Sequence, residues 1–174
     1  VLLFVGRLFE RKRPWDMITL HKLLNKNHKV YTVMVGNGPM EENLKQKTAK
    51  EENFLMVGFK NQEEVREYYH GADLLVVPSD YETWGLVVNE AFATGTPAIV
   101  TDTCGVADDL VLPGKTGFVY EMGKPEQAVN FIEGLIKNPD KLRQLSHKAR
   151  EKVAKEYTVD QFAKAFVTAL NRVS

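Results

Sequence analysis

Short apolar runs alternate with longer stretches of helical periodicity along most of this chain, and this alternation restricts its possible folds more than any other feature. Several runs are apolar throughout, which is typical of strands covered on both faces by helices. A chain that alternates such strands with helices is predicted to form a doubly wound α/β fold around a parallel sheet. The runs lie at 1–5, 30–35, 54–57, 74–77, 97–100 and 117–119.

Helical periodicity is clearest near the end of the chain. Apolar side chains recur three and four residues apart over 128–136 and again over 162–170, which places each set on one face of a helix. The last three expected helices have no strand between them, so we expect a helical C-terminal tail. The helices are expected at 14–26, 40–50, 62–71, 85–94, 105–111, 124–137, 139–155 and 158–173.

Charge and cysteine content restrict the functional class. The 174 residues carry 23 basic and 23 acidic side chains, which argues against a general nucleic-acid or membrane-surface binder. The single cysteine, Cys104, has no internal disulfide partner, which favours a reducing cytoplasm. No run approaches the roughly 18 apolar residues of a membrane span, and the histidines are not spaced as zinc ligands. The chain starts inside its first strand without a methionine, so we expect it to be a piece of a longer protein.

Ligands of doubly wound sheets bind beyond the carboxyl ends of the strands, so the loops there are the candidates for a site. The first of these loops contains Gly6, Arg7 and Lys12 and leads through Pro14 into a helix. An arginine fork and a lysine point charge are together suited to a diphosphate. A solvated basic loop without a ligand would have the same composition, so both interpretations stay open.

Two glycine-containing loops are similar to nucleotide motifs without completing them. Gly36-Asn37-Gly38-Pro39 lacks the third glycine of a dinucleotide fingerprint. Gly114-Lys115-Thr116 matches the end of a P-loop, but Asp109 stands where that motif requires its first glycine. Each is interpreted as a plain turn.

The segment 78–90, after the fourth expected strand, is the most informative. Glu82 and Glu90 lie on either side of an expected helix start, where Gly85 would let a ligand approach the backbone. The free N–H groups and positive dipole end of a helix start suit a phosphate. Eight helical residues span roughly 12 Å, about the reach from a sugar across a diphosphate to a ribose, and a carboxylate can accept hydrogen bonds from a diol. One surface acid and one acid on a helix face remain the alternative.

The nine residues from Glu82 to Glu90 (ETWGLVVNE) resemble the E-x7-E signature of retaining GT-B glycosyltransferases, family 4 in particular. Other landmarks of that family occur in the same order over nearly the whole chain, and the resemblance implies that 1–174 is the C-terminal, donor-binding domain of a two-domain enzyme. The landmarks are the Gly-Arg-Leu loop with its lysine (6–8 and 12), the Val-Gly-x-Gly-Pro turn (35–39), the Tyr-x-x-Ala-Asp segment (69–73), the Gly-Thr-Pro step (95–97) and the Gly-Lys-Thr-Gly turn (114–117).

The resemblance implies a role for each matching residue. Arg7 and Lys12 would neutralise the donor diphosphate and, with Glu82, form the catalytic set. Glu82 would hold the hydroxyls of the transferred sugar, and Glu90 would hold the ribose diol. The backbone at the helix start would contact sugar and phosphates, and the end of the third strand would border the base. The other implied contact residues are Gly6, Val57, Gly58, Phe59, Thr83, Trp84, Gly85 and Leu86.

The chain departs from the family pattern at two places. The family often has paired glycines followed by glutamate after the fifth strand, where this chain has Cys104-Gly105-Val106-Ala107-Asp108. It often has glycine after the lysine of the first loop, where this chain has Arg13. Both departures bear on the identity of the donor sugar more than on the class of reaction.

The implied reaction transfers a sugar from a nucleoside diphosphate sugar to an acceptor with retained configuration, without a metal ion or other cofactor. The expected partners are that donor and an N-terminal acceptor domain absent from this chain, through which alone a peripheral membrane contact would form; no nucleic-acid partner is expected. The chain alone is expected to be inactive. In the resembled fold the last helix crosses back to the N-terminal domain, so Phe162, Phe166 and Leu170 are expected to be partly exposed or docked on a neighbouring copy.

Two other functions stay open at this point. One is a nucleotide-sugar epimerase-like enzyme with the same fold, and the other is a non-catalytic nucleotide- or sugar-sensing module. The sequence of the longer protein would separate them, because a second domain with a glycine-rich first loop favours a transferase and a regulatory domain favours a sensor.

Overall fold

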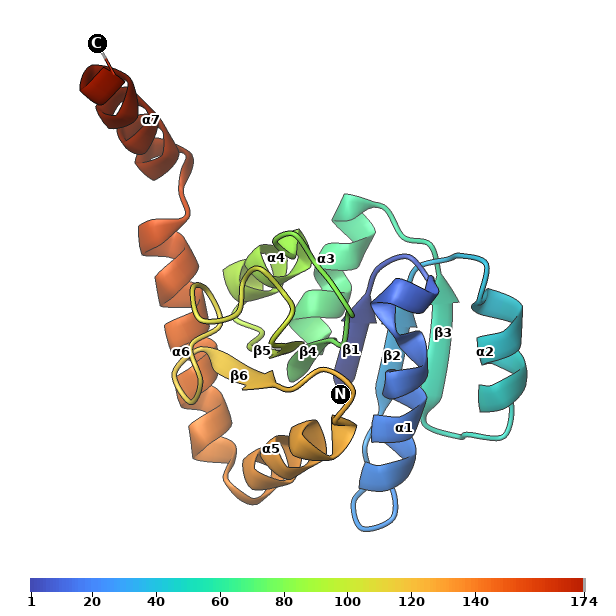
Figure 1. Ribbon diagram of the computed structural model, residues 1–174. Coiled ribbons are helices and arrows are strands. Elements are labelled where there is room, and N and C mark those ends of the chain that lie inside the picture. The colour runs from blue at the N-terminus through green and yellow to red at the C-terminus, as the bar shows by residue number, and fades with distance from the viewer. Residues whose placement is uncertain (174) are drawn as a thin grey trace.

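The computed structural model describes residues 1–173, and at its centre is a six-stranded parallel sheet (Figure 1). The strand order is β3-β2-β1-β4-β5-β6, the order of doubly wound nucleotide-binding folds. Each of the six apolar runs forms a strand, so the predicted parallel α/β sheet is confirmed. The strands are β1 (Leu2–Val5), β2 (Thr32–Val35), β3 (Phe54–Gly58), β4 (Leu74–Val77), β5 (Ala98–Thr101) and β6 (Gly117–Tyr120).

Helices cover both faces of this sheet, with α1, α2 and α5 on one face and α3, α4 and α6 on the other (Figure 1). A short 3-10 turn, η1 (Glu10–Lys12), precedes α1. Seven of the eight predicted helices are present, with ends that lie within two residues of expectation. The helices are α1 (Pro14–Leu24), α2 (Glu41–Thr48), α3 (Gln62–Gly71), α4 (Leu86–Thr94), α5 (Pro125–Lys137), α6 (Pro139–Glu156) and α7 (Val159–Val173).

The apolar composition of the strands follows from burial on both faces. Leu2 and Phe4 of β1 point into the core beneath α1 and α5, whereas Leu3 points into the core beneath α3 and α4. All three side chains are at most 3% exposed. Because the sheet has no solvent-facing side at its centre, the strands carry no polar–apolar alternation.

The prediction of a helix over 105–111 is wrong, because this segment is a loop of turns. The N–H groups of Gly105 and Val106 donate to the carbonyls of Glu82 and Trp84, in another loop, and not along a helix. Asp108 has a φ of 65°, in the left-handed region, which a right-handed helix excludes. Val106 and Leu110 are fully buried nevertheless, so their helix-like spacing reflects burial of a loop.

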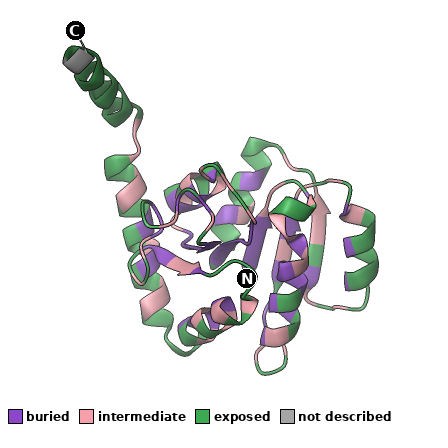
Figure 2. Ribbon diagram, in the orientation of Figure 1, coloured by how far each residue is buried: buried purple, intermediate pink, exposed green. Residues whose placement is uncertain are grey.

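The three C-terminal helices are consecutive, as predicted, but only α7 stands away from the domain (Figure 1). α5 and α6 contribute buried side chains to the core, among them Ile132 and Leu145. In α7 every side chain up to residue 171 is exposed (Figure 2), including Phe162 at 73% and Phe166 at 56%. The expected exposure of this apolar stripe is confirmed.

Over the described residues, no helix combines the length and apolarity needed to cross a membrane.

Candidate functional site

The loops that carry the predicted site residues all follow the carboxyl ends of strands. β1 is followed by residues 6–13, β3 by 59–61, and β4 by 78–85. Because β1 pairs in parallel with β4, and through β2 with β3, the loops after β1, β3 and β4 meet at one edge of the sheet. The fold therefore brings together segments that are 70 residues apart in the sequence, as in the contact between Lys12 and Glu82.

Backbone contacts between glycines hold the loops after β1, β2 and β3 together. A Cβ on Gly36 would lie 1.8 Å from the carbonyl oxygen of Gly6, and a Cβ on Gly38 would lie 2.6 Å from that of Leu8. The N–H of Gly36 donates to the carbonyl of Gly58 at 2.8 Å. The turn at 36–39 is therefore more than the plain turn expected, because its glycines let neighbouring loops approach backbone to backbone.

A hollow of about 160 Å³ lies between these loops and brings together three predicted site residues, Gly6, Arg7 and Phe59. The Arg7 guanidinium lies over the ring of Phe9, 4.8 Å from its centre, and Phe59 is 69% exposed. Asn37 and Lys60 also line the hollow. The sequence alone does not assign Asn37 and Lys60 to the site, although Asn37 lies between the two glycines of the turn at 36–39 and Lys60 follows Phe59.

Lys12 and Glu82 form an ion pair across the site. Lys12 ends the 3-10 turn before α1, and Glu82 lies in the loop before α4. Both side chains are 19% exposed, so the pair is shielded from solvent on most sides. The structure thus brings together the cation expected at a diphosphate and the carboxylate expected at a sugar.

The loop after β5 supports the backbone around Glu82. The N–H of Gly105 donates to the carbonyl of Glu82 at 2.8 Å, and the N–H of Val106 donates to that of Trp84 at 3.2 Å. A Cβ on Gly105 would lie 2.1 Å from the carbonyl oxygen of Thr83. The loop that departs from the family pattern therefore still needs glycine at 105, and it holds Glu82 in place.

Unpaired backbone donors lie at the start of α4. Gly85 caps the helix with a φ of 110°, a conformation that favours glycine. Within the part of the chain that the structure describes, the N–H groups of Trp84, Gly85 and Leu86 form no hydrogen bond. With the helix dipole behind them, these N–H groups can donate hydrogen bonds to an anion such as a phosphate.

The side chains of Trp84 and Leu86 point to the far side of this loop. The Trp84 indole donates to Asn89 Oδ1 at 2.8 Å and packs against the ring of Tyr157, with 5.9 Å between centres. Leu86 is 70% exposed, and both side chains line a hollow that reaches the start of α7. The predicted contacts of these residues with sugar and phosphate involve their backbone N–H groups and not these side chains.

Glu90 lies apart from the Lys12–Glu82 pair, on the face of α4 toward α3. Its carboxylate accepts a hydrogen bond of 2.8 Å from the hydroxyl of Tyr69, and both residues line a hollow of about 350 Å³ together with Arg66. Burial, and then this hydrogen bond, raise the pKa of Tyr69 well above its ordinary value. In the sequence Tyr69 belongs only to a family landmark, and nothing in the sequence predicts its contact with Glu90.

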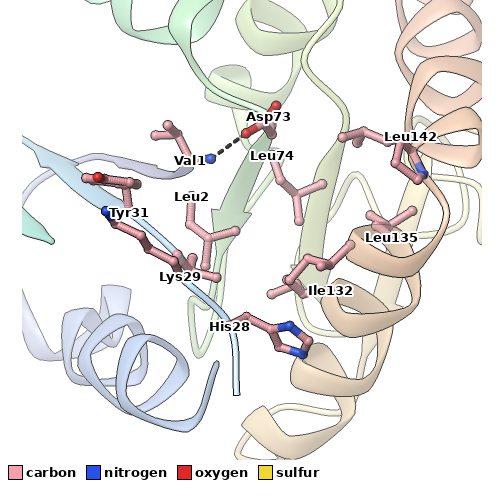
Figure 3. Close-up of a pocket in the computed structure, with 13 residues that line it drawn as sticks. Val1, Leu2, His28, Lys29, Tyr31, Asp73, Leu74, Ile132, Leu135 and Leu142 are labelled. Atoms are coloured by element: carbon pink, nitrogen blue, oxygen red, sulfur yellow. Dashed lines mark hydrogen bonds and ion pairs between the residues drawn. The ribbon is translucent and has the colours of Figure 1, made fainter. Parts of the chain in front are cut away.

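A further hollow, of about 340 Å³, opens at the opposite edge of the sheet (Figure 3). It is lined mainly by apolar side chains such as Leu2, Ile132 and Leu142, and Asp73 also lines it. It contains none of the predicted site residues.

The described residues contain no cluster of three or more His, Cys, Asp or Glu arranged to hold a metal ion.

Comparison with known proteins identifies a family. The model of the family Glycosyl transferases group 1 matches residues 1–152. An uncharacterized glycosyltransferase of Methanocaldococcus jannaschii is 27% identical over 96% of this chain and 43% of its own length. Glycogen synthase of Mycobacterium tuberculosis is 29% identical over 90% of this chain and 38% of its own.

A solved structure shares the fold. An Anabaena protein crystallised in complex with UDP superposes on 98% of this chain and 48% of its own, with a TM-score of 0.86 and 21% identity. The chain therefore spans less than half the length of the relatives it matches here. Since the family model covers most of the chain, the chain belongs to the Glycosyl transferases group 1 family.

Proposed function

We propose that this chain is the donor-binding domain of a retaining GT-B glycosyltransferase, which transfers a sugar from a nucleoside diphosphate sugar to an acceptor. One observation carries the proposal, namely the contact of Lys12 with Glu82 beside the unpaired N–H groups at the start of α4. A cation, a carboxylate and free backbone donors meet there, and these groups suit a phosphate joined to a hydroxyl-rich sugar.

The proposed chemistry uses charges that are fixed before the reaction begins. As the bond from the sugar to the diphosphate breaks, negative charge develops on the departing phosphate. Arg7, Lys12 and the start of α4 would stabilise that charge, and Glu82 would hold the sugar hydroxyls in position. We assign the neutralising role to these side chains and propose that no metal ion or cofactor takes part.

Glu90 would bind the ribose in this proposal. Its position on α4, one turn beyond the helix start, and its contact with Tyr69 support that assignment, because a held carboxylate presents its oxygens to a diol in one orientation. Phe59, exposed at the end of β3, is proposed to border the base. The Anabaena neighbour has also been crystallised with UDP-glucose, which supports a nucleoside diphosphate sugar as the donor.

Titration calorimetry of this chain with UDP, GDP and ADP, each beside its own nucleoside, tests the proposal. At least one diphosphate should bind. Arg7→Ala should weaken that binding about tenfold and leave nucleoside binding nearly unchanged, since a charge-assisted contact contributes roughly 1.5–3 kcal/mol. Thr19→Ala, on an exposed face of α1, is the control. Equal loss for diphosphate and nucleoside would show a structural role for Arg7, and no binding by any diphosphate would refute the proposal.

Activity is proposed for the longer protein and not for this chain alone. An N-terminal domain would supply the acceptor site and exclude water from the sugar, so residues 1–174 should show no transfer by product mass spectrometry. In the longer protein, Glu82→Gln should suppress transfer and spare diphosphate binding, whereas Glu90→Gln should weaken both. A cytoplasmic location is part of the proposal and is supported by the lone buried Cys104.

A further inference from the structure

Arg13 connects two of the loops that form the site. Its guanidinium donates two hydrogen bonds to Asp16 in the first turn of α1, at 2.8 and 3.1 Å, and one to Asp80 in the loop after β4, at 3.0 Å. Asp16 is 7% exposed, so one end of the link is anchored in the core. The planar guanidinium can satisfy both carboxylates at once because its donors point in different directions.

The backbone at Arg13 is unusual for an arginine. Its φ of 48° and ψ of 50° lie in the left-handed region, where glycine is unstrained and other residues are uncommon. This chain nevertheless has arginine at the position where the resembled family often has glycine. The side chain contacts with two carboxylates give a physical reason for an arginine here, since glycine could adopt the backbone but could not make the link.

Two other contacts, including the Lys12–Glu82 pair itself, join the same two loops beside this link. The N–H of Asp80 donates to the carbonyl of Arg11 at 2.8 Å, and Lys12 bonds to Glu82 beside it. Three successive residues of the first loop, 11–13, therefore contact the segment 80–82 of the fourth loop. A shift of one loop relative to the other would separate Lys12 from Glu82.

We propose that Arg13 is a positioning residue that fixes the distance between Lys12 and Glu82 by linking Asp16 to Asp80. This inference rests on the proposed function, because it assigns the link to the binding of a nucleoside diphosphate. Arg13 itself does not need to touch the ligand. Its contact with Asp80 sets the position of the fourth loop, and its contact with Asp16 ties that loop to the start of α1.

Removing the Asp80 carboxylate distinguishes a positioning role from a purely electrostatic one, because the two predict opposite changes in diphosphate affinity. Asp80 is an acid close to the proposed diphosphate site, so its charge alone opposes the binding of an anion, and its removal would then strengthen binding. If Asp80 instead holds the loop through Arg13, its removal weakens binding. Asp80→Ala leaves the partly buried Arg13–Asp16 pair intact, and the Asp80 side chain is 42% exposed, so the fold should be kept.

The experiment compares Asp80→Ala with Glu10→Ala by calorimetry, using UDP, GDP and ADP and their nucleosides. Glu10 is an exposed acid in the same 3-10 turn as Lys12, and its carboxylate has no partner among the described residues, so the control removes the same charge without breaking the link. Asp80→Ala should weaken diphosphate binding about fivefold, the upper end of what a partly exposed ion pair contributes, and leave nucleoside binding unchanged. Glu10→Ala should leave diphosphate binding unchanged or slightly stronger.

Amide hydrogen exchange provides a readout that needs no ligand. The amide of residue 80, bonded to Arg11, should exchange faster in Asp80→Ala than in the unmodified chain, and no faster in Glu10→Ala. Unchanged or tighter diphosphate binding in Asp80→Ala, or unchanged exchange at residue 80, would overturn the positioning role while the proposed function stands. Failure of the unmodified chain to bind any diphosphate would overturn the proposed function, and the positioning role with it.

Discussion

Gly105 should be among the positions where a single methyl group causes the largest loss of stability. A Cβ there would lie 2.1 Å from the carbonyl oxygen of Thr83 and 2.8 Å from its carbonyl carbon. Both atoms belong to the backbone, so no side chain can rotate away to make room. In Gly105→Ala, the loop after β5 must therefore move away from the loop that carries Glu82.

The expected cost follows from the contacts that this movement disturbs. Overfilling a packed site costs roughly 1–3 kcal/mol. The two hydrogen bonds from Gly105 and Val106 to the carbonyls of Glu82 and Trp84 would lengthen, and each contributes about 1 kcal/mol. Partial relaxation makes these effects overlap, so the free energy of unfolding should fall by about 2–4 kcal/mol.

Urea unfolding followed by circular dichroism measures this cost, and Gly134→Ala provides the matched control. Gly134 lies inside α5, and a Cβ there would meet no atom within 4 Å. Alanine at 134 should raise the free energy of unfolding by about 0.5–1 kcal/mol, because glycine is a poor helix former. If Gly105→Ala lost less than about 1 kcal/mol, the two loops would not be in the close contact that supports Glu82.

Three further predictions concern buried polar groups. Tyr120→Phe should raise the free energy of unfolding by about 1 kcal/mol in urea titrations, because the buried hydroxyl has no partner among the described residues; a loss would show that it is bonded. Tyr69→Phe should lower that free energy by about 1 kcal/mol, since its hydroxyl donates to Glu90; an unchanged value would count against this bond. Burial lowers the pKa of His21, so the unfolded chain binds the proton more readily. The contribution of His21 to the free energy of unfolding is therefore full above a pH of about 6.5 and is lost as the pH falls toward the folded pKa. In urea titrations between pH 7.5 and 4.5, the free energy of unfolding of His21→Gln should fall less steeply than that of the unmodified chain.

Much of the architecture could be predicted because the strands are buried on both faces. Uniformly apolar runs mark such strands whatever their neighbours are, and the helices between them carry a clear period. The helix predicted over 105–111 was wrong because the spacing of buried residues in this loop is the same as in a helix. Its backbone N–H groups bond to a loop that precedes it by some twenty residues, and local periodicity contains no information about such a contact.

The site could be predicted as a set of loops, and less well as a set of contacts. Strand ends and sequence landmarks placed Arg7, Lys12 and Glu82 at one edge of the sheet. The partners that hold the site, such as Asp80 for Arg13 and Tyr69 for Glu90, depend on how side chains from different loops meet. Aspartate and tyrosine occur in many environments, so the sequence alone does not predict these contacts.

The exposure of α7 affects how the chain unfolds. A helix of 15 residues that buries little against its neighbours gains little from tertiary packing, and helices of that length are only marginally stable alone in water. Its helix–coil equilibrium should therefore be separate from the cooperative transition of the sheet domain. The chain then contains two thermodynamic units, and a sloping circular dichroism baseline before the main transition would report the gradual melting of α7.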